Sequence, residues 1–398
     1  MANPTNVAPR GAISAAAPDA LVIGAGPGGL AAAAALRHYG LRPLVLERAQ
    51  RLGASWHGHY DRLHLHTTRR LSALPGLPIP RRFGRWVSRD DVVRYLELYA
   101  DHHALDIATG IEVERVERAA GTDSDSAAGA GWSLPATGGR VLTAPVVVVA
   151  TGHNHTPHIP AWNGVDTFTG DLLHASAYRN ATPYRGKDVL IAGAGNTGAE
   201  IAVDLAEGGA ARVRLAVRTP PHILRRSTAG WPAQASGILC RRLPVGVVDR
   251  VATRVERLSV PDLAAYGLPR PADGLYSRVR QGAIPVQDVG LIAAVRARKV
   301  EPVAAVAEFE GGTVRLADGA ETAPEVVVAA TGYRRGLEPL VGHLGVLDER
   351  GRPVVHGRRT PPGAPGLYFT GFTNPISGMF REMAIDARRI ARAVARGR

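Results

Sequence analysis

The stretch Gly24-Ala25-Gly26-Pro27-Gly28-Gly29 decides the fold of this 398-residue chain. Before it stand four apolar residues, 20–23, which predict a short buried strand, and after it an Ala-rich run, 30–39, which predicts a helix. A further apolar run at residues 43–46 predicts a second strand. A strand, a glycine turn, a helix and a second strand in this order form a β-α-β unit of the kind that binds dinucleotides.

Each glycine of the turn is there for a different physical reason. Gly24 permits the tight turn, Gly26 lets the backbone approach a pyrophosphate, and Gly29 lets the helix pack closely on the strand. The start of the helix then offers unpaired N–H groups and the positive end of its dipole to an anion. Glu47 ends the second strand, where a carboxylate is expected to bond the ribose hydroxyls. The turn therefore predicts a nucleotide site, which we assign to FAD.

The same order of elements returns at residues 188–217. Gly193-Ala194-Gly195-Asn196-Thr197-Gly198 repeats the glycine spacing, but Arg218, and not an acid, follows the second strand. A carboxylate there would repel a 2′-phosphate, whereas a guanidinium bonds one through its planar fork. The pattern favours NADPH over NADH, with Arg225 and Arg226 as further candidates. The alternative is that Arg218 is one more surface arginine.

Two dinucleotide folds in one chain give the predicted organisation. Residues 111–116 and 132–142 flank a Gly/Ser/Asp-rich loop and predict a small surface β-meander inserted in the first fold. Two valine runs, 146–149 and 326–328, read as buried parallel strands that stop at an Ala-Thr-Gly turn. We predict an α/β protein with two Rossmann-like domains, the NADPH domain (161–302) being inserted in a discontinuous FAD domain (19–160 and 303–398) behind a disordered arm (1–18).

Composition narrows the classes of function. Cys240 is the only cysteine, which excludes a disulfide framework, a cysteine-based zinc site and a Cys-x-x-Cys redox pair. The net charge of +13 comes almost wholly from arginines spread along the chain, so it does not predict a nucleic-acid surface. No uncharged apolar run reaches the roughly 18 residues of a membrane span. We expect a cytoplasmic protein with neither a membrane nor a nucleic-acid partner, and its oligomeric state stays unknown.

The segment between the two folds carries a family resemblance. Phe168-Thr-Gly-Asp-Leu-Leu-His174-Ala-Ser-Ala-Tyr178 fits F-x-G-x-x-x-H-x-x-x-Y at all four fixed positions. It resembles the identifying motif of the flavin-containing monooxygenases, the single-component class B flavoprotein enzymes. Further segments, 60–66, 74–80, 284–290 and 366–372, resemble the YUCCA-type members, which oxidise indole-3-pyruvate. These segments follow the order of the family over most of the chain.

The resemblance implies a function and a set of site residues. It implies an NADPH- and O₂-dependent enzyme that forms a flavin C4a-hydroperoxide and oxygenates a small organic substrate, with an aryl-pyruvate such as indole-3-pyruvate favoured. His66, His174 and Tyr178 are the catalytic candidates, the last two as organisers of the junction between the cofactors more than as acid–base groups. The expected cofactor-binding residues are Gly24, Gly26, Gly28, Gly29, Glu47, Arg48, Trp56, Thr151, Gly152, Gly193, Gly195, Asn196, Thr197, Gly198, Arg218, Thr331, Gly332, Tyr333 and Gly371.

Departures from related enzymes leave alternatives open. Animal flavin monooxygenases carry Asn where His66 stands, and Baeyer–Villiger enzymes carry Trp where Tyr178 stands. Residues 374–382, at the start of a predicted C-terminal helix (379–396), differ from the plant sequences. The alternatives are N- or S-oxygenation of an amine or sulfide, Baeyer–Villiger oxidation, and a flavin-binding redox protein that oxygenates nothing. The lone Cys240 removes a pyridine-nucleotide disulfide reductase.

Two groups of histidines invite a metal interpretation. They are His57, His59, His64 and His66, and His153, His155 and His158. Neither group contains a cysteine, and both fall where the family places loops that contact the cofactors. We therefore predict that these histidines line the site as polar groups and bind no metal.

Overall fold

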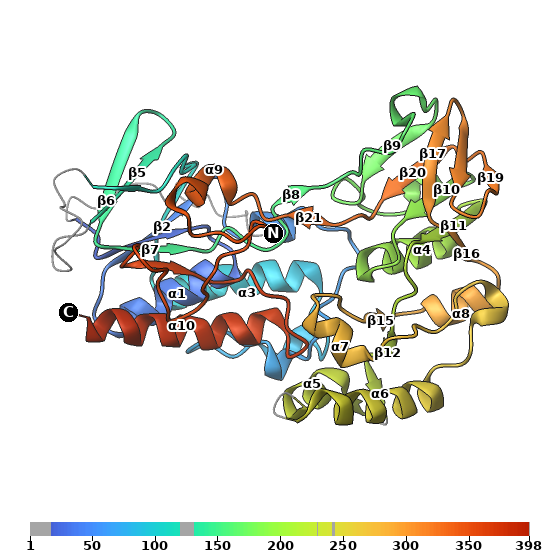
Figure 1. Ribbon diagram of the computed structural model, residues 1–398. Coiled ribbons are helices and arrows are strands. Elements are labelled where there is room, and N and C mark those ends of the chain that lie inside the picture. Colours follow the sequence, from blue (N-terminus) through green and yellow to red (C-terminus); the bar gives the residue numbers. More distant parts are fainter. Residues whose placement is uncertain (1–16, 120–130, 229, 241–242, 398) are drawn as a thin grey trace, which may run out of the picture.

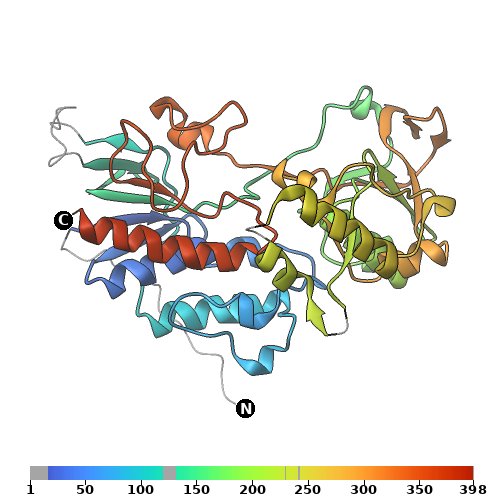
Figure 2. The same ribbon diagram turned by 60° about the horizontal axis from the view of Figure 1, so that its bottom comes forward.

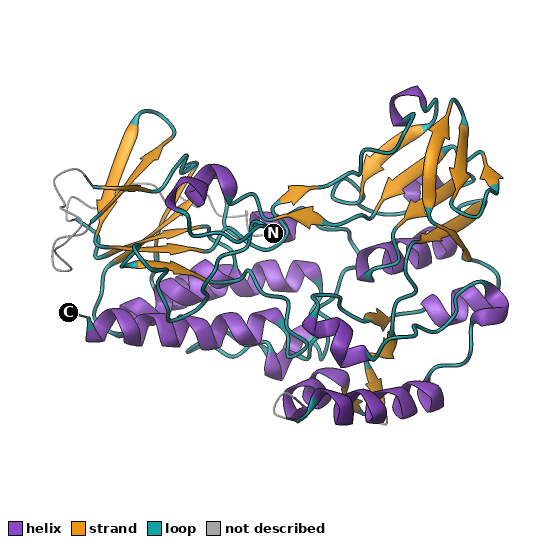
Figure 3. Cartoon of the chain, viewed as in Figure 1, coloured by secondary structure: helices purple, strands orange, loops and turns teal. Residues whose placement is uncertain are grey.

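The computed structural model describes residues 17–119, 131–228, 230–240 and 243–397 (Figure 1). The predicted N-terminal arm lies almost entirely outside these ranges, as does the Gly/Ser/Asp-rich loop of the predicted meander. Two α/β units stand side by side in Figure 1 and are joined by extended chain. Figure 3 shows that each unit has its own sheet with helices beneath it.

The first sheet is built around the strand that precedes the first glycine turn. Its strand order is β22-β7-β1-β2-β3, and all neighbouring strands are parallel. The strands are β1 (Ala20–Ile23), β2 (Pro43–Glu47), β3 (Asp106–Thr109), β7 (Val146–Val149) and β22 (Leu367–Phe369). Since β22 comes from the C-terminal part of the chain, this sheet is discontinuous in sequence.

Alternate residues of the first sheet face two different layers. Val22, Val45 and Val148 pack with the helices α1 (Pro27–His38), α3 (Arg89–His102) and α10 (Met379–Arg396). Leu21, Leu44 and Val147 pack with the meander β4 (Glu117–Arg118), β5 (Trp132–Ala136) and β6 (Arg140–Ala144) and with α9 (Glu338–Val341). The two-residue period of the strands thus builds both cores. Figure 2 shows α10 lying along this unit.

Helix α1 begins three residues earlier than its apolar pattern predicts. Gly26 is its N-cap and Pro27 its first residue. Proline suits that position because its fixed φ is helical and the first N–H of a helix has no partner in any case. The C-terminal helix α10, in contrast, has the predicted bounds.

The second sheet repeats the plan of the first. Its strand order is β16-β11-β10-β20-β9, again wholly parallel. Helices α4 (Asn196–Gly208) and α8 (Leu291–Arg296) pack on one face, and the antiparallel sheet β17-β18-β19 covers the other. The strands are β9 (Asp171–His174), β10 (Asp188–Ala192), β11 (Arg212–Val217), β16 (Glu301–Ala304), β17 (Val306–Glu310), β18 (Thr313–Leu316), β19 (Glu321–Thr322) and β20 (Val326–Ala329).

Strand β20 corrects the predicted boundary of the inserted fold. The predicted junction at residues 302/303 gave this valine run to the FAD fold, but β20 pairs with β10 at the centre of the second sheet. The chain leaves the first fold through β8 (Thr156–Pro157) and returns through β21 (Tyr333–Arg334), and these two short strands pair antiparallel. The inserted fold therefore extends about 30 residues further along the chain than predicted.

A smaller helical layer lies below the second sheet in Figure 1. It contains α5 (Ala233–Cys240), α6 (Val245–Ser259), α7 (Leu275–Arg280) and the strand pairs β12 (Ile223–Arg225) with β15 (Val286–Asp288) and β13 (Ser227–Thr228) with β14 (Trp231–Pro232). The short helix α2 is Ala54–His57, and single 3₁₀ turns are Arg69–Leu71, Arg81–Phe83, Val165–Thr167, Thr182–Tyr184, Ala264–Tyr266 and Gly342–Leu344. Within the described ranges, no helix has the length and apolar character needed to cross a membrane.

The close approach of α1 to β1 makes a stability prediction. A β-carbon on Gly29 would lie 1.9 Å from the carbonyl oxygen of Gly24, whereas one on Gly26 would meet nothing within 4 Å. Overpacking of this kind costs about 1–3 kcal/mol or more. We expect Gly29→Ala to lower the free energy of unfolding by about 3 kcal/mol in urea denaturation. Gly246→Ala, where a β-carbon also meets nothing within 4 Å, is the matched control, and equal losses in the two variants would contradict this account.

Candidate active site between the two dinucleotide folds

The two glycine turns have the same geometry. Gly24 and Gly193 both have positive φ, 106° and 117°. A β-carbon on Gly24 would lie 2.7 Å from the Ala150 oxygen, and one on Gly193 would lie 2.5 Å from the Ala330 oxygen. Each turn is therefore pressed against the residue that directly follows the neighbouring valine strand, so no larger residue fits there.

The third residue of each turn opens a helix towards free space. Gly26 and Gly195 are the N-caps of α1 and α4, and neither helix start has a side-chain cap. A β-carbon on either glycine would meet nothing within 4 Å. Two helix N-termini thus present unpaired N–H groups to open space, which is the arrangement that a pyrophosphate requires. Both turns fit the dinucleotides predicted for them.

Glu47 is held rigidly at the end of β2. Its carboxylate accepts a 2.8 Å hydrogen bond from the N–H of Ala25 and a 3.0 Å bond from the N–H of Ala49, and the residue is 8% exposed. The neighbouring Arg48 lies 3.9 Å from Glu112 and is half exposed. Glu47 therefore stands beside the first glycine turn, in the position predicted for a ribose partner.

One cavity of about 960 Å³ connects the two turns. It runs from Gly26 of the first fold to Gly195 of the second and is lined by residues from both. A volume of this size is at the upper end of the range for small-molecule sites, as a site shared by cofactor and substrate requires. The cavity is thus placed where two bound dinucleotides would meet.

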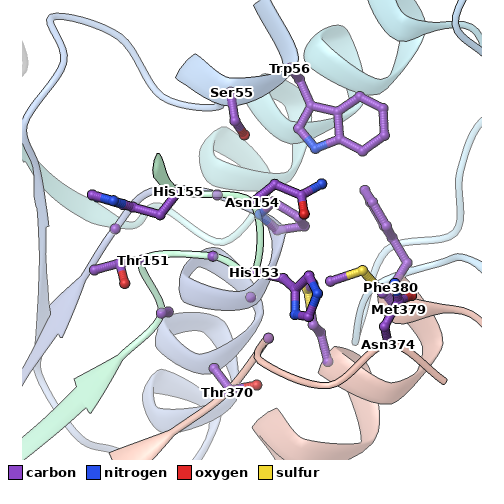
Figure 4. Close-up of a pocket in the computed structure, with 18 of the residues that line it drawn as sticks. Ser55, Trp56, Thr151, His153, Asn154, His155, Thr370, Asn374, Met379 and Phe380 are labelled. Carbon is purple, nitrogen blue, oxygen red and sulfur yellow. The ribbon is translucent and has the colours of Figure 1, made fainter. Parts of the chain in front are cut away.

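An aromatic corner forms one wall of the cavity (Figure 4). The ring of Trp56 packs edge-to-face against Phe380, at 5.7 Å and 75°, and against His59, at 5.5 Å and 70°. Met379 stands beside Phe380, and Asn374 and His153 lie on the same side of the cavity. Such a wall suits a flat, apolar group carrying a few polar atoms.

Three histidines that line the cavity have lowered pKa values. Burial lowers the pKa of His59 to about 4, and the charges of Arg179 and Arg89 act in the same direction. Burial, followed by a nearby arginine charge, also lowers the pKa of His153 and of His155. These imidazoles are therefore uncharged at neutral pH and offer hydrogen bonds without positive charge.

His174 belongs to the motif at residues 168–178, which we call the fingerprint segment. It ends β9 and contacts the residues at the start of β21. Its Nδ1 accepts from the N–H of Ser176 at 3.0 Å, so its Nε2 carries the proton and donates to the carbonyl of Gly332 at 2.9 Å. Its ring packs edge-to-face on Tyr333 at 4.9 Å. Both ring nitrogens are thus used within the protein, and His174 is not among the residues lining the cavity.

Tyr178 is fully buried beside helix α4. Its hydroxyl donates to Asp204 at 2.5 Å, its ring stacks on Tyr184 at 5.5 Å, and it touches the edge of Tyr60. Burial and the Asp204 carboxylate raise the pKa of Tyr178 far above its usual value. Tyr178, like His174, does not line the cavity and makes its polar contacts within the protein, and the roles of both residues remain predictions.

The other predicted residues fall into two groups. Those that line the cavity are His66, Gly24, Gly26, Gly28, Glu47, Arg48, Trp56, Thr151, Gly152, Gly195, Asn196, Thr197, Gly332 and Gly371. Those that do not are Gly29, Gly193, Gly198, Arg218, Thr331 and Tyr333. The three glycines of the second group instead allow the close packing of turn, helix and strand. Arg218 is exposed directly after β11.

Arg225 and Arg226, the further candidates for the 2′-phosphate, are engaged elsewhere. Arg225 donates to the carbonyl of Ser259, and Arg226 donates to the carbonyl of Leu65 and lies 4.5 Å over the ring of Trp86. Arg226 thus contacts the first fold and is a junction residue.

The sequence analysis missed several polar and aromatic residues of the cavity. Ser55, Thr67, Asn154, Gln234, Gln287, Thr370 and Phe380 line it, and none was singled out, although Gln287, Thr370 and Phe380 stand inside the segments 284–290, 366–372 and 374–382. Their only signal in the sequence is that most lie within a few residues of a predicted motif. Gln234 is the exception, because α5 brings it to the cavity from the helical layer of the second fold, where it bonds Thr68 and Ser377 of the first.

Fold and cavity together define an oxidoreductase with two dinucleotide sites that face each other. A family model described as "Pyridine nucleotide-disulphide oxidoreductase" matches residues 21–229. Indole-3-pyruvate monooxygenase YUCCA1 of Oryza sativa subsp. japonica is 37% identical, over 89% of this chain and 87% of that protein. The flavin-containing monooxygenase of Stenotrophomonas maltophilia is 26% identical, with a TM-score of 0.69 over 95% and 98% of the two chains. OTEMO in complex with FAD and NADP, 18% identical, shares the fold with a TM-score of 0.69 over 96% and 85%.

The chain belongs to the flavin-containing monooxygenase family and has YUCCA-type enzymes among its relatives. It is a monooxygenase that uses FAD and NADPH. The matching family model is named for a disulphide reaction, but this chain has one cysteine, Cys240, and so lacks a redox pair. What the chain shares with that model is the scaffold with two dinucleotide sites. These findings confirm the predicted family, fold class and cofactors.

Gly26 and Gly195, which both face open space, allow a pair of matched predictions. A methyl group on Gly26 would occupy the space in front of α1, and one on Gly195 the space in front of α4. We expect Gly26→Ala to weaken FAD binding about tenfold with little effect on the affinity for NADP⁺, and Gly195→Ala to do the reverse. Flavin content and fluorescence titration with NADP⁺ measure the two affinities. Equal loss of both ligands in either variant would contradict the assignment of one turn to each cofactor.

Proposed function

We propose that this monooxygenase oxygenates an aryl-substituted 2-oxo acid, with indole-3-pyruvate as the first compound to test. The observation that carries the proposal is the aromatic corner of Trp56, His59 and Phe380 in the cavity that joins the two glycine turns. An edge-to-face wall of this kind accommodates an indole or phenyl ring. The named activity of the rice relative, indole-3-pyruvate monooxygenase, supports the same choice.

The chain's own residues bind, orient and exclude water in this reaction. When bound, NADPH supplies the hydride and FAD the oxygen chemistry. The glycine turns fix the two cofactors, and apolar lining side chains such as Leu63, Leu65 and Ile376 exclude water. Asn374, which has an amide that can donate and accept, would bond the polar end of the substrate.

The oxygenation of a sulfide or an amine is the second candidate. The S-allyl-L-cysteine S-oxygenase of Allium sativum shares the fold at 19% identity, so the scaffold serves that chemistry too. The cavity argues against an amine because, within the described residues, the carboxylates that line it are Glu47, which already accepts from Ala25 and Ala49, Glu112, which lies 3.9 Å from Arg48, and Glu114. A cytoplasmic location and the lack of a nucleic-acid partner remain part of the proposal.

A coupling assay tests the substrate class. We expect indole-3-pyruvate and phenylpyruvate to raise the rate of NADPH oxidation at least fivefold, with loss of CO₂ and gain of one oxygen atom in the product by mass. Amines, sulfides and cyclic ketones serve as the comparison set. If one of these gives the larger amount of product per NADPH, the aryl-pyruvate assignment is wrong. Peroxide release with every compound would instead favour a redox protein that does not oxygenate.

Arg218 gives a test of cofactor selectivity. Because a guanidinium at the end of β11 would bond the 2′-phosphate of NADPH, we expect Arg218→Ala to raise the KM for NADPH about tenfold, equivalent to about 1.4 kcal/mol, and to leave that for NADH unchanged. Steady-state kinetics with both nucleotides measure the change. Arg254→Ala, which removes an exposed arginine of α6, is the control. A similar rise for NADH would remove the proposed role.

A further inference from the structure

Glu200 of α4 is a carboxylate buried between the two folds, with 2% of its surface exposed. Its Oε2 accepts a 3.1 Å hydrogen bond from the hydroxyl of Tyr60, and its Oε1 lies 3.0 Å from Nε2 of His66. Within the described ranges, Oε1 accepts no hydrogen bond, so its contact with His66 is one of proximity and charge. Burying a carboxylate is costly unless it is paired, so these contacts with the first fold are the compensation that the structure provides.

His66 presents its two ring nitrogens to different surroundings. Nε2 faces the Glu200 carboxylate, whereas Nδ1 is buried and has no hydrogen-bond partner among the described residues. Two lone pairs facing each other would repel, so Nε2 carries a proton in either protonation state of the ring. Because His66 lines the cavity, Nδ1 is the nitrogen left for a ligand.

We propose that Glu200 is the positioning residue for His66, and that it holds Nε2–H so that Nδ1 can accept a hydrogen bond from a group in the cavity or, when protonated, donate one. The arrangement follows the general pattern of a carboxylate that fixes the tautomer of a catalytic histidine. Only a proton moves at Nδ1, between the imidazole and the ligand.

The carboxylate and the imidazole come from different folds. Glu200 lies one turn after Asn196, in the helix that begins at the second glycine turn, while His66 belongs to the first fold. The pair therefore exists only while the two folds are docked. Further contacts on the same helix face maintain that docking, since Arg62 pairs with Asp204 and Glu207. Docking of the NADPH fold is thereby linked to the tautomer of a histidine in the substrate cavity.

The tautomer is the direct test, and it needs no substrate. In protein labelled with ¹⁵N-histidine, the His66 signals are assigned by their loss in His66→Gln. We expect the ring nitrogens to show Nε2 protonated in the wild-type protein at every pH from 6 to 9, and the Nδ1–H tautomer to gain population in Glu200→Ala. A predominantly Nδ1–H neutral ring in the wild-type protein would overturn the proposal.

Kinetics test the functional link in the loaded enzyme. We expect Glu200→Gln to lower the amount of product formed per NADPH about tenfold and to change its pH profile, with the KM for NADPH and the FAD content unchanged. Because Glu200 acts through His66, His66→Gln/Glu200→Gln should be no worse than His66→Gln alone. Glu310→Gln is the matched control, since it makes the same change at an exposed side chain that takes no part in docking the folds.

Two kinetic outcomes would overturn the proposal. The first is that the effects of the two substitutions multiply in the double variant, which would mean that Glu200 does not act through His66. The second is that Glu200→Gln raises the KM for NADPH, which would give Glu200 a role in binding the nucleotide. The inference rests on the proposal that the cavity is the oxygenation site, but it does not require the substrate to be an aryl-pyruvate. The yield of product per NADPH can be measured with any compound that the enzyme turns over. The tautomer of His66 can be measured without a substrate.

Discussion

The close approach of a helix to a strand at each glycine turn is the constraint on which the rest of the structure depends. Gly29 and Gly198 allow α1 and α4 to start almost against the carbonyl oxygens of Gly24 and Gly193. Only this contact aims the first N–H groups of each helix at one open space. The cavity opens in front of both helix starts and is lined by residues of both folds.

Helix α4 also holds the two folds together. One face of it carries Glu200, Asp204 and Glu207, spaced so that they lie in a row along the helix. These carboxylates bond the side chains of Tyr60 and Arg62 of the first fold and of Tyr178 of the fingerprint segment. The fingerprint tyrosine is thus part of the framework between the folds.

The cavity combines apolar walls with uncharged polar groups. Lowered pKa values keep His59, His153 and His155 neutral, so they do not attract competing anions into the site. The buried carboxylate of Glu200 is turned towards Tyr60 and His66. Such a site can orient an oxygenation substrate by hydrogen bonds while excluding the water that would divert the reaction.

The sequence by itself determined the two turns, their helices, the cofactors and the family, because glycine spacing and a strand–turn–helix order are local properties. It did not determine which sheet β20 joins, since β7 and β20 are both valine runs that end in Ala-Thr-Gly and press on a glycine turn in the same way. Only tertiary pairing distinguishes the two. The same holds for Glu200 and His66, 134 positions apart in the printed sequence, whose contact arises because the folded chain docks one dinucleotide fold on the other.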